Sequence, residues 1–362
     1  MNLIKKLKLH IIIIICIGLI SVFSCIQLCQ GSYEIKPIDV YNALTDKNIW
    51  NFNTISHSIL GESICNSLNI SSPPEISTSS LIIWNIRLPR ILVGILVGIN
   101  LALAGCIFQT ITQNEMASPY TLGISQGAGL SIMVTLIFFP HMTNMLPLFA
   151  MIGGIISFFI VYGIAYNHGT SPIKLVLAGI VLGAITGAIQ KVLFLFLSNI
   201  ETIQNATNWT LGSLIGIGWT QFKLMLPWSF LATFLLLYFN KPMDMLLLGD
   251  NTAKSLGMSI EKWRMILSII GILLASSSVA AVGLLGFIGL IVPHVARTLL
   301  SSSHKNLFTA CIFIGPTFVI IADTISRLLF NPIQLPIGVV TGALGGLFFL
   351  FLMKKKRNIT KL

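Results

Sequence analysis

Residues 88–108 read LPRILVGILVGINLALAGCIF, a run in which Arg90 is the only charged residue. An α-helix of about 20 apolar residues crosses a hydrocarbon core of roughly 30 Å, and it satisfies its own backbone hydrogen bonds there. This stretch therefore predicts a membrane-spanning helix. Comparable runs recur along nearly the whole chain.

The composition extends this prediction to the full length of the protein. Of the 362 residues, 55% are hydrophobic and only 9% are charged, whereas a soluble domain carries about 25% charged residues. We therefore predict an all-α polytopic membrane protein with about ten transmembrane helices. The expected helices cover residues 9–29, 88–108, 120–139, 145–166, 174–198, 220–239, 265–285, 286–300, 307–329 and 335–353.

Composition also divides the chain into four parts. Residues 1–30 place three lysines before an apolar run, as a signal peptide does, but no small-residue cleavage site follows, which favours a retained first transmembrane helix. Residues 31–86 are expected to form an external loop region, because they contain three prolines and five of the eleven acidic residues. Residues 87–353 are the expected transmembrane core, and residues 354–362 are a basic tail.

The net charge of +11 is explained by membrane topology rather than by nucleic-acid binding. If the N-terminus is cytoplasmic, 15 of the 22 Lys and Arg residues lie on that side, as the positive-inside rule requires. Both termini are then cytoplasmic. The cytoplasmic set is Lys5, Lys6, Lys8, Lys174, Lys241, Lys254, Lys262, Arg264, Arg297, Lys305, Lys354, Lys355, Lys356, Arg357 and Lys361.

Sequence patterns for metal and nucleotide binding are missing. The chain contains no HExxH motif and no GxxxxGK[ST] phosphate loop, and its six cysteines are scattered without a CxxC pair. We therefore expect no catalytic residue, no metal site and no disulfide framework. An intramembrane protease or lipid phosphatase is disfavoured, because it would need converging ionisable residues within the helices.

A charged segment, GDNTAKSLGMSIEKWR at residues 249–264, interrupts the apolar tracts. Apolar residues recur in it at helical spacing, and Gly257 is placed to separate two short helices with Asp250 and Ser259 as N-caps. The apolar face consists of Ala253, Leu256, Ile260 and Trp263. Two interpretations remain open: an amphipathic anchor at the membrane surface, or a contact surface for a partner protein.

Five ordered motifs resemble a known family. They are RLPRILVGILVGINLALAG (87–105), QNEMASPYTLGISQGAG (113–129), GDNTAKSLG (249–257), GLLGFIGLIVPHVAR (283–297), and ADTISRLLF followed by LPIGVVTGALGG (322–346). Over about residues 81–353 the chain resembles the FecCD-type permeases of type II ABC importers for iron-siderophores, haem and vitamin B12. The resemblance implies the all-α type II ABC importer permease fold, with ten helices per subunit, and a homodimer or a heterodimer with a related subunit.

The resemblance also implies roles for particular residues. In the family, the cytoplasmic segment between helices six and seven inserts into the ATPase, external arginines receive acidic residues of a docked binding protein, and helix five lines the translocation path. The matching positions are Gly249, Asp250, Ala253, Leu256 and Gly257 for ATPase coupling, Arg87, Arg90 and Arg327 for docking, and Gln190 and Lys191 for the path.

Alternative interpretations apply to several of these residues. The external arginines could simply reach the membrane interface with their long side chains, and so could Lys191. If Lys191 faces the path, its charge suits an anionic chelate of iron. Asp323 is expected to pair with Arg327 four residues later in the same helix.

Two further positions matter for the resemblance. His294, near the cytoplasmic end of helix eight, is expected to make a structural contact at the subunit or ATPase boundary. Gln334 stands where the family commonly has Glu.

Together these features predict a permease subunit that translocates an iron-siderophore across the cytoplasmic (inner) membrane, with haem or vitamin B12 (cobalamin) as the alternative substrate. The chain is expected to be no enzyme and to bind no cofactor, since ATP and Mg are used by two cytoplasmic ABC ATPase subunits. The other expected partners are an external or periplasmic substrate-binding protein and membrane lipid, with no nucleic acid. A secondary transporter would be favoured only if transport survived without an ATPase.

Overall fold

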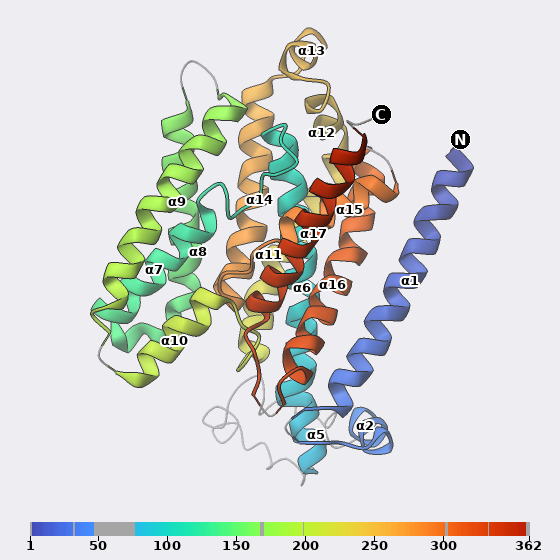
Figure 1. The fold of residues 1–362 in the computed structure, drawn as a ribbon, viewed down its shortest axis with the longest axis vertical. Helices are drawn as coiled ribbons and strands as arrows, with labels where there is room; N and C mark the ends of the chain where they lie inside the picture. The colour runs from blue at the N-terminus through green and yellow to red at the C-terminus, as the bar shows by residue number, and fades with distance from the viewer. Residues whose placement is uncertain are drawn as a thin grey trace, which may run out of the picture.

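The computed structural model describes residues 2–31, 33–46, 77–166, 170–197, 199–300, 303–331 and 333–359. Within these ranges the chain is helical, and its only β-type pairing is an isolated bridge between Tyr166 and Thr170 (Figure 1). Most of the expected external loop, residues 47–76, lies outside the described residues, and so does Cys65. The five described cysteines are free.

Seven helices in the described ranges are long and apolar enough to cross a membrane. They are α1 (Asn2–Cys29), α6 (Leu88–Ile111) with the turns before it, α8 (Leu146–Ala165), α9 (Pro172–Phe194), α11 (Trp219–Tyr238), α14 (Ile260–Val282) and α16 (His304–Leu328). Three shorter apolar helices are α7 (Ile124–Phe138), α15 (Ile288–Leu299) and the apolar part of α17 (Ile337–Ile359). Each expected range coincides with one of these helices, so the prediction of an all-α polytopic protein is confirmed.

Several short helices complete the described chain. Within the expected external loop lie α2 (Pro37–Leu44), α5 (Thr78–Ile82) and a π-helical turn, η1 (Ile83–Arg87). A 3-10 turn, η2 (Pro140–Met145), joins α7 to α8, while α10 (Ile200–Leu211), α12 (Asn240–Leu246) and α13 (Asp250–Ser255) lie between longer helices. The sequence did not predict α10, whose polar composition reads as a loop.

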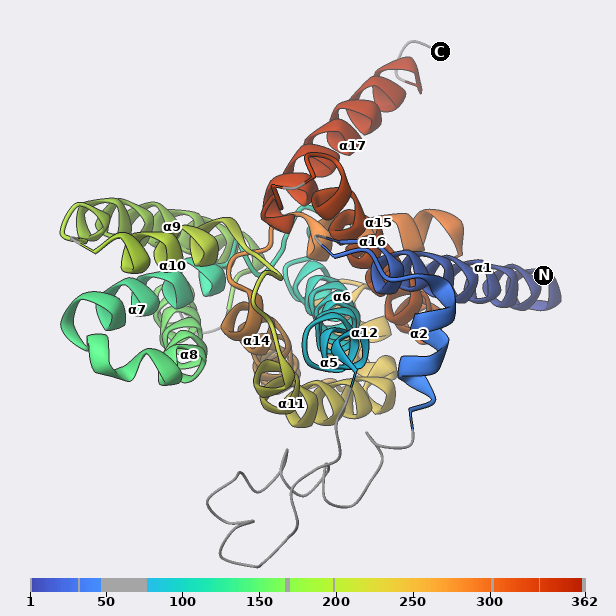
Figure 2. The same ribbon diagram turned by 90° about the horizontal axis from the view of Figure 1, so that it is seen from below.

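The centre of the bundle is α6, which packs against α11, α14, α15 and α16 (Figure 2). Glycines allow these helices to approach closely. A Cβ on Gly98 would lie 2.5 Å from the backbone nitrogen of Pro316, and a Cβ on Gly105 would lie 1.8 Å from the carbonyl oxygen of Gly289. Small residues permit this contact between backbones in a membrane bundle. The GxxxG spacing at Gly94 and Gly98 therefore serves packing inside the subunit.

The boundary between α14 and α15 is a broken helix. Gly283 adopts a φ of 77°, in the left-handed region that favours glycine. The freed backbone groups bind the end of α10 and the residues after it: Leu284 N donates to Trp209 O at 2.9 Å, and Ser213 N donates to Val282 O at 2.8 Å. Such irregular backbone is tolerated inside a membrane protein when neighbouring segments satisfy its polar groups.

The two ends of the bundle differ in content. The start of α1, the end of α17, α12 and α13 lie at one end, and α2 and α5 lie at the opposite end (Figure 1). Seen from the α2 end, α17 projects away from the body of the bundle (Figure 2). The chain therefore crosses between the ends an even number of times, as the charge pattern predicts.

Candidate functional site

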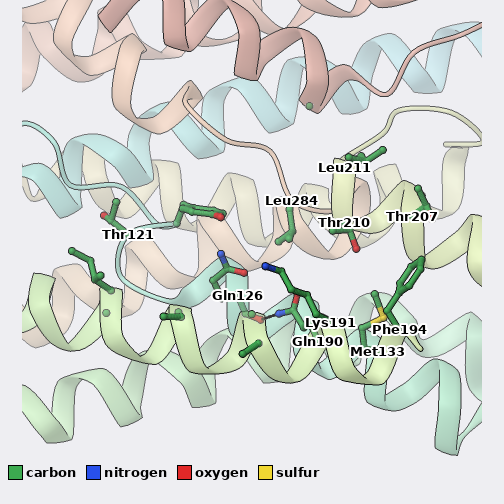
Figure 3. Close-up of a pocket in the computed structure, with 18 of the residues that line it drawn as sticks. Thr121, Gln126, Met133, Gln190, Lys191, Phe194, Thr207, Thr210, Leu211 and Leu284 are labelled. Carbon is green, nitrogen blue, oxygen red and sulfur yellow. Dashed lines mark hydrogen bonds between the residues drawn. The ribbon is translucent and has the colours of Figure 1, made fainter. Parts of the chain in front are cut away.

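A cavity of about 990 Å³ lies between α7, α9 and α10 and is closed on one side by the start of α17 and by Leu284 (Figure 3). Small-molecule sites commonly have volumes of about 300–1,000 Å³, so this cavity has room for a large ligand. Its wall along α9 includes small residues on successive turns, together with Ile180 and Phe194. The small residues are Gly179, Gly183, Ala184, Gly187 and Ala188.

Among the described residues that line the cavity, Lys191 is the only charged one, and none is a carboxylate. Its side chain extends from α9 into the cavity (Figure 3). Neighbouring Gln190 is buried, and its Nε2 donates to the backbone carbonyl of Gln126 in α7 at 2.6 Å. Other polar side chains that line the cavity belong to Thr121, Gln126, Thr207 and Thr210. Of the two predicted path residues, Lys191 therefore points into the cavity. Gln190 instead forms the hydrogen bond that connects the α9 wall of the cavity to the α7 wall.

The predicted docking arginines gather at the opposite end of the bundle from α13. Arg90 binds Asp323 of α16 at two points, with Nη2 to Oδ1 at 2.7 Å and Nε to Oδ2 at 3.1 Å. Its remaining Nη1 donates to Gln334 Oε1 at 2.9 Å. Asp323 therefore forms its ion pair with Arg90, and the predicted pair with Arg327 in the same helix is wrong. Side-chain direction decided this, because the Asp323 carboxylate faces α6.

Arg87 and Arg327 bind the C-terminal end of α1. Arg87 donates to the backbone oxygens of Leu28 and Tyr33, and Arg327 Nη2 donates to Gln30 O at 2.9 Å. Cations at a helix C-terminus are favoured by the partial negative charge of its free carbonyl groups. The three arginines are only 4–7% exposed, so in this structure they are occupied by the chain itself. Their role in docking stays a prediction.

The predicted ATPase-coupling segment forms α13 and the turn that follows it. Gly249 and Gly257 adopt φ values of 93° and 82°, in the left-handed region that favours glycine. Ala253 is buried, whereas Leu256 is 59% exposed at the tip of the turn. The expected second short helix is the first part of α14, which continues without interruption into the membrane-spanning segment.

The N-cap predictions for this segment were partly wrong. Gly249 rather than Asp250 is the N-cap of α13, and the Asp250 carboxylate instead accepts from Arg264 Nη2 at 2.9 and 3.1 Å. Ser259 is the N-cap of α14, but its side chain makes no capping hydrogen bond. Opposite charges at residues 250 and 264 were a signal for this ion pair, but only the turn at Gly257 brings them together.

A second polar cluster anchors α12, and sequence reasoning missed it. Asp244 Oδ1 accepts from the backbone N–H of His304 at 2.8 Å and lies 2.7 Å from its Nδ1, while His304 Nε2 lies 2.8 Å from Thr110 Oγ1. Burial tends to raise the pKa of the Asp244 carboxyl, but the hydrogen bonds and charge of His304 outweigh it and hold that pKa below its ordinary value. The cluster connects α12 to α16 and α6.

His294 contacts Glu115, with Nδ1 and Oε2 3.4 Å apart. The two residues connect α15 to the segment between α6 and α7, and the contact expected for His294 at the subunit or ATPase boundary stays a prediction. Within the described residues, no three His, Cys, Asp or Glu side chains gather in a way that could hold a metal ion.

Comparison with known proteins identifies the family. The model of the FecCD transport family matches residues 19–355. The chain belongs to the FecCD transport family. Among curated relatives in this family, the iron(3+)-hydroxamate import system permease protein FhuG of Bacillus subtilis is 36% identical over 283 residues, which cover 76% of this chain and 84% of the relative. The Fe(3+) dicitrate transport system permease protein FecD of Escherichia coli is 34% identical, over 76% of this chain and 86% of the relative.

A solved structure shares the fold. It is described as an inward-facing conformation of a metal-chelate type ABC transporter, and it superposes with a TM-score of 0.78 at 24% identity over 95% of this chain and 99% of its own. The expected permease fold is therefore confirmed. As a FecCD member, the chain is a multi-pass membrane permease subunit of the ABC importer class.

Proposed function

We propose that this FecCD permease carries an intact ferric chelate across the cytoplasmic membrane. The observation that carries the proposal is the similarity to relatives that are themselves named as importers of iron(3+)-hydroxamate and Fe(3+) citrate or dicitrate, each over about three quarters of this chain. The large cavity beside α9 supplies a place for such a ligand. Haem or cobalamin import, the alternative substrate assignment, receives no support from these relatives.

The positive charge of the cavity restricts the class of ferric chelate that we propose as substrate. Lys191 gives the cavity a positive charge that no carboxylate among the described lining residues offsets, and the amide of Gln126 and the hydroxyl of Tyr120 can donate hydrogen bonds to ligand oxygens. Such a site favours a chelate with net negative charge or with outward carboxylate or catecholate oxygens. Lys191 is therefore the proposed electrostatic contact, while Gln190 shapes the wall from behind.

The proposed assembly contains a second permease subunit, identical or related, two cytoplasmic ATPases that use ATP and Mg, and an external or periplasmic binding protein. Two features of the chain support this arrangement. The α13 helix, whose C-cap is the exposed Leu256, lies at the same end as the start of α1 and the end of α17, which agrees with a cytoplasmic contact surface (Figure 1). The chain itself has no phosphate-binding loop, so the driving energy must come from another subunit.

The proposed docking face for the binding protein is the end that carries α2 and α5. Arg87, Arg90 and Arg327 place three positive charges there against one buried carboxylate, Asp323. Because the arginines are buried, they would attract an acidic partner through the local positive potential rather than through fully exposed side chains.

Uptake measurements test the proposed function. Radiolabelled ferric citrate, ferric hydroxamate, haem and cobalamin are supplied one at a time to a strain that lacks the protein, to the complemented strain, and to a strain with Gly257→Pro. We expect ferric chelate uptake to fail in the deletion strain, to return on complementation, and to fail again with Gly257→Pro. Loss of haem or cobalamin uptake alone would contradict the proposed substrate, and intact uptake with Gly257→Pro would contradict the role of the coupling segment.

A further inference from the structure

Arg264, in the first turns of α14, is a buried cation that joins two other segments. Its side chain is only 1% exposed. Nη2 binds both carboxylate oxygens of Asp250, the first residue of α13. Nη1 donates to the backbone carbonyl of Thr170 at 2.8 Å and lies 3.0 Å from its hydroxyl oxygen. One guanidinium therefore connects the proposed ATPase contact to the segment that leads into α9.

Glu261, which also belongs to α14, forms further hydrogen bonds with Thr170. Glu261 Oε1 accepts from Thr170 N, and Glu261 Oε2 accepts from its hydroxyl, both at 2.8 Å. Glu261 Oε2 also accepts from the Tyr162 hydroxyl near the end of α8 at 3.3 Å. The backbone N–H, the backbone carbonyl and the hydroxyl of Thr170 are thus all bound by α14 residues, which leaves this residue little freedom to move independently.

The connection from Thr170 to the cavity is short and stiff. α9 begins at Pro172, two residues further on, and proline restricts the backbone at that point. The same helix carries the small-residue wall of the cavity and, near its other end, Lys191. A displacement of the start of α9 is therefore a displacement of one wall of the cavity.

Arginine is chemically suited to this position. Its planar guanidinium presents donors in two directions, so it can bind a carboxylate and a carbonyl group at once, whereas lysine offers a single ammonium. A buried guanidinium that lost Asp250 would keep only the more distant carboxylate of Glu261, whose Oε1 lies 3.7 Å from Nη1. Asp250 and Arg264 are therefore expected to move together.

We propose that Arg264 is a positioning residue for energy coupling, which transmits displacement of α13 to α9 and hence to the substrate cavity. The proposal rests on the proposed function, because it takes α13 as the surface on which the ATPase acts. It adds a defined route from that surface to the cavity, through Asp250, Arg264 and Thr170.

The test measures how much ferric chelate is transported for each ATP hydrolysed. The complete complex, with its ATPases and binding protein, is reconstituted in vesicles and supplied with radiolabelled ferric citrate, ferric hydroxamate or ferric catecholate. The variants are Arg264→Met, Thr170→Val and the double variant. Ser268→Ala is the matched control, because Ser268 is buried one turn further along α14 and its hydroxyl has no hydrogen-bond partner among the described residues.

We expect Arg264→Met to assemble and hydrolyse ATP but to transport about tenfold less chelate per ATP, and Thr170→Val to show a smaller loss. Because both residues lie on one route, the double variant should be no worse than Arg264→Met alone. An unchanged ratio in Arg264→Met, or losses that multiply in the double variant, would overturn the proposal. If the complex with Arg264→Met does not assemble, the Thr170→Val variant becomes the test. An unchanged amount of chelate transported per ATP in Thr170→Val then overturns the proposal.

The proposed function and the role of Arg264 fail in different ways. A wild-type complex that transports none of the three ferric chelates would contradict the proposed function. A wild-type complex that transports one of them, with variants that keep the wild-type ratio of transport to hydrolysis, would contradict only the role of Arg264.

Discussion

Arg90 and Asp323 are 233 positions apart in sequence, yet their side chains form a two-point ion pair that joins α6 to α16. Both residues are buried, with 7% and 1% of their surface exposed. Gln334 binds the third donor position of Arg90, so the segment before α17 joins the same cluster. One arginine therefore joins α6, α16 and the segment before α17.

Removal of the carboxylate from this cluster should destabilise the protein. Asp323→Asn leaves Arg90 buried without a countercharge, a change that costs about 3–5 kcal/mol in buried pairs. We expect a clear fall in the thermal unfolding temperature of the purified protein in detergent. Glu34→Gln, an exposed carboxylate beyond the end of α1, is the control and should leave that temperature unchanged. An unchanged temperature in Asp323→Asn would show that the pair does not stabilise the fold.

A change of charge at Lys191 should alter transport without altering the fold. Lys191 is exposed in the cavity, and loss of its charge removes an attraction of about 1 kcal/mol in water and about 4 kcal/mol at a lower effective dielectric constant of about 20. We therefore expect Lys191→Gln to reduce uptake of an anionic ferric chelate about tenfold or more, and Lys191→Glu to reduce it further.

Lys223→Gln is the matched control for Lys191, because Lys223 is exposed on α11 and does not line the cavity. Uptake rates are compared at equal amounts of protein in the membrane. Equal uptake in Lys191→Glu and the wild type would exclude an electrostatic contact with the substrate.

Leu256 should matter for assembly rather than for folding. Its side chain is 59% exposed at the turn after α13, so Leu256→Asp removes little buried surface from the chain itself. We expect normal amounts of protein but weaker copurification of the ATPase, because an apolar contact is replaced by a buried charge in the complex. Tyr41→Asp, at a 64% exposed apolar residue of α2 at the opposite end, should leave copurification intact. Undiminished copurification of the ATPase with Leu256→Asp would remove the turn from the interface.

Gly105→Ala should prevent normal packing of α6 against α15. A Cβ at this position would overlap the carbonyl group of Gly289, which is backbone and cannot rotate away. Overpacking of this kind costs typically about 1–3 kcal/mol and occasionally more. We expect less protein in the membrane and a lower unfolding temperature. Gly18→Ala is the control, because nothing lies within 4 Å of a Cβ there. If Gly105→Ala were present in the membrane at the wild-type amount, α6 and α15 would be able to move apart without loss of stability.

Several features could be read from sequence because they depend on local composition. The run at 88–108 and its counterparts predicted the spanning helices, and Gly257 was recognised as a break between two helices. The polar helix α10 was missed, since its stability comes from packing against α7 and α17 and not from an apolar pattern. Lys191 was a candidate because it matches a position in the helix that lines the path in the family, but the sequence could not show whether its side chain faces that path.

The sequence by itself determined the fold class, the family and the separation of charged from apolar segments, because bilayer thickness and backbone hydrogen bonding allow few alternatives for such a composition. Only the tertiary structure decided the partners of its buried charges. Asp323 was free in sequence to pair with Arg327 but faces Arg90, and Asp250 binds Arg264 rather than capping α13. Such pairings depend on helix rotation and on turns between segments, which arise from the packing of the whole chain and leave no periodic signal in the sequence.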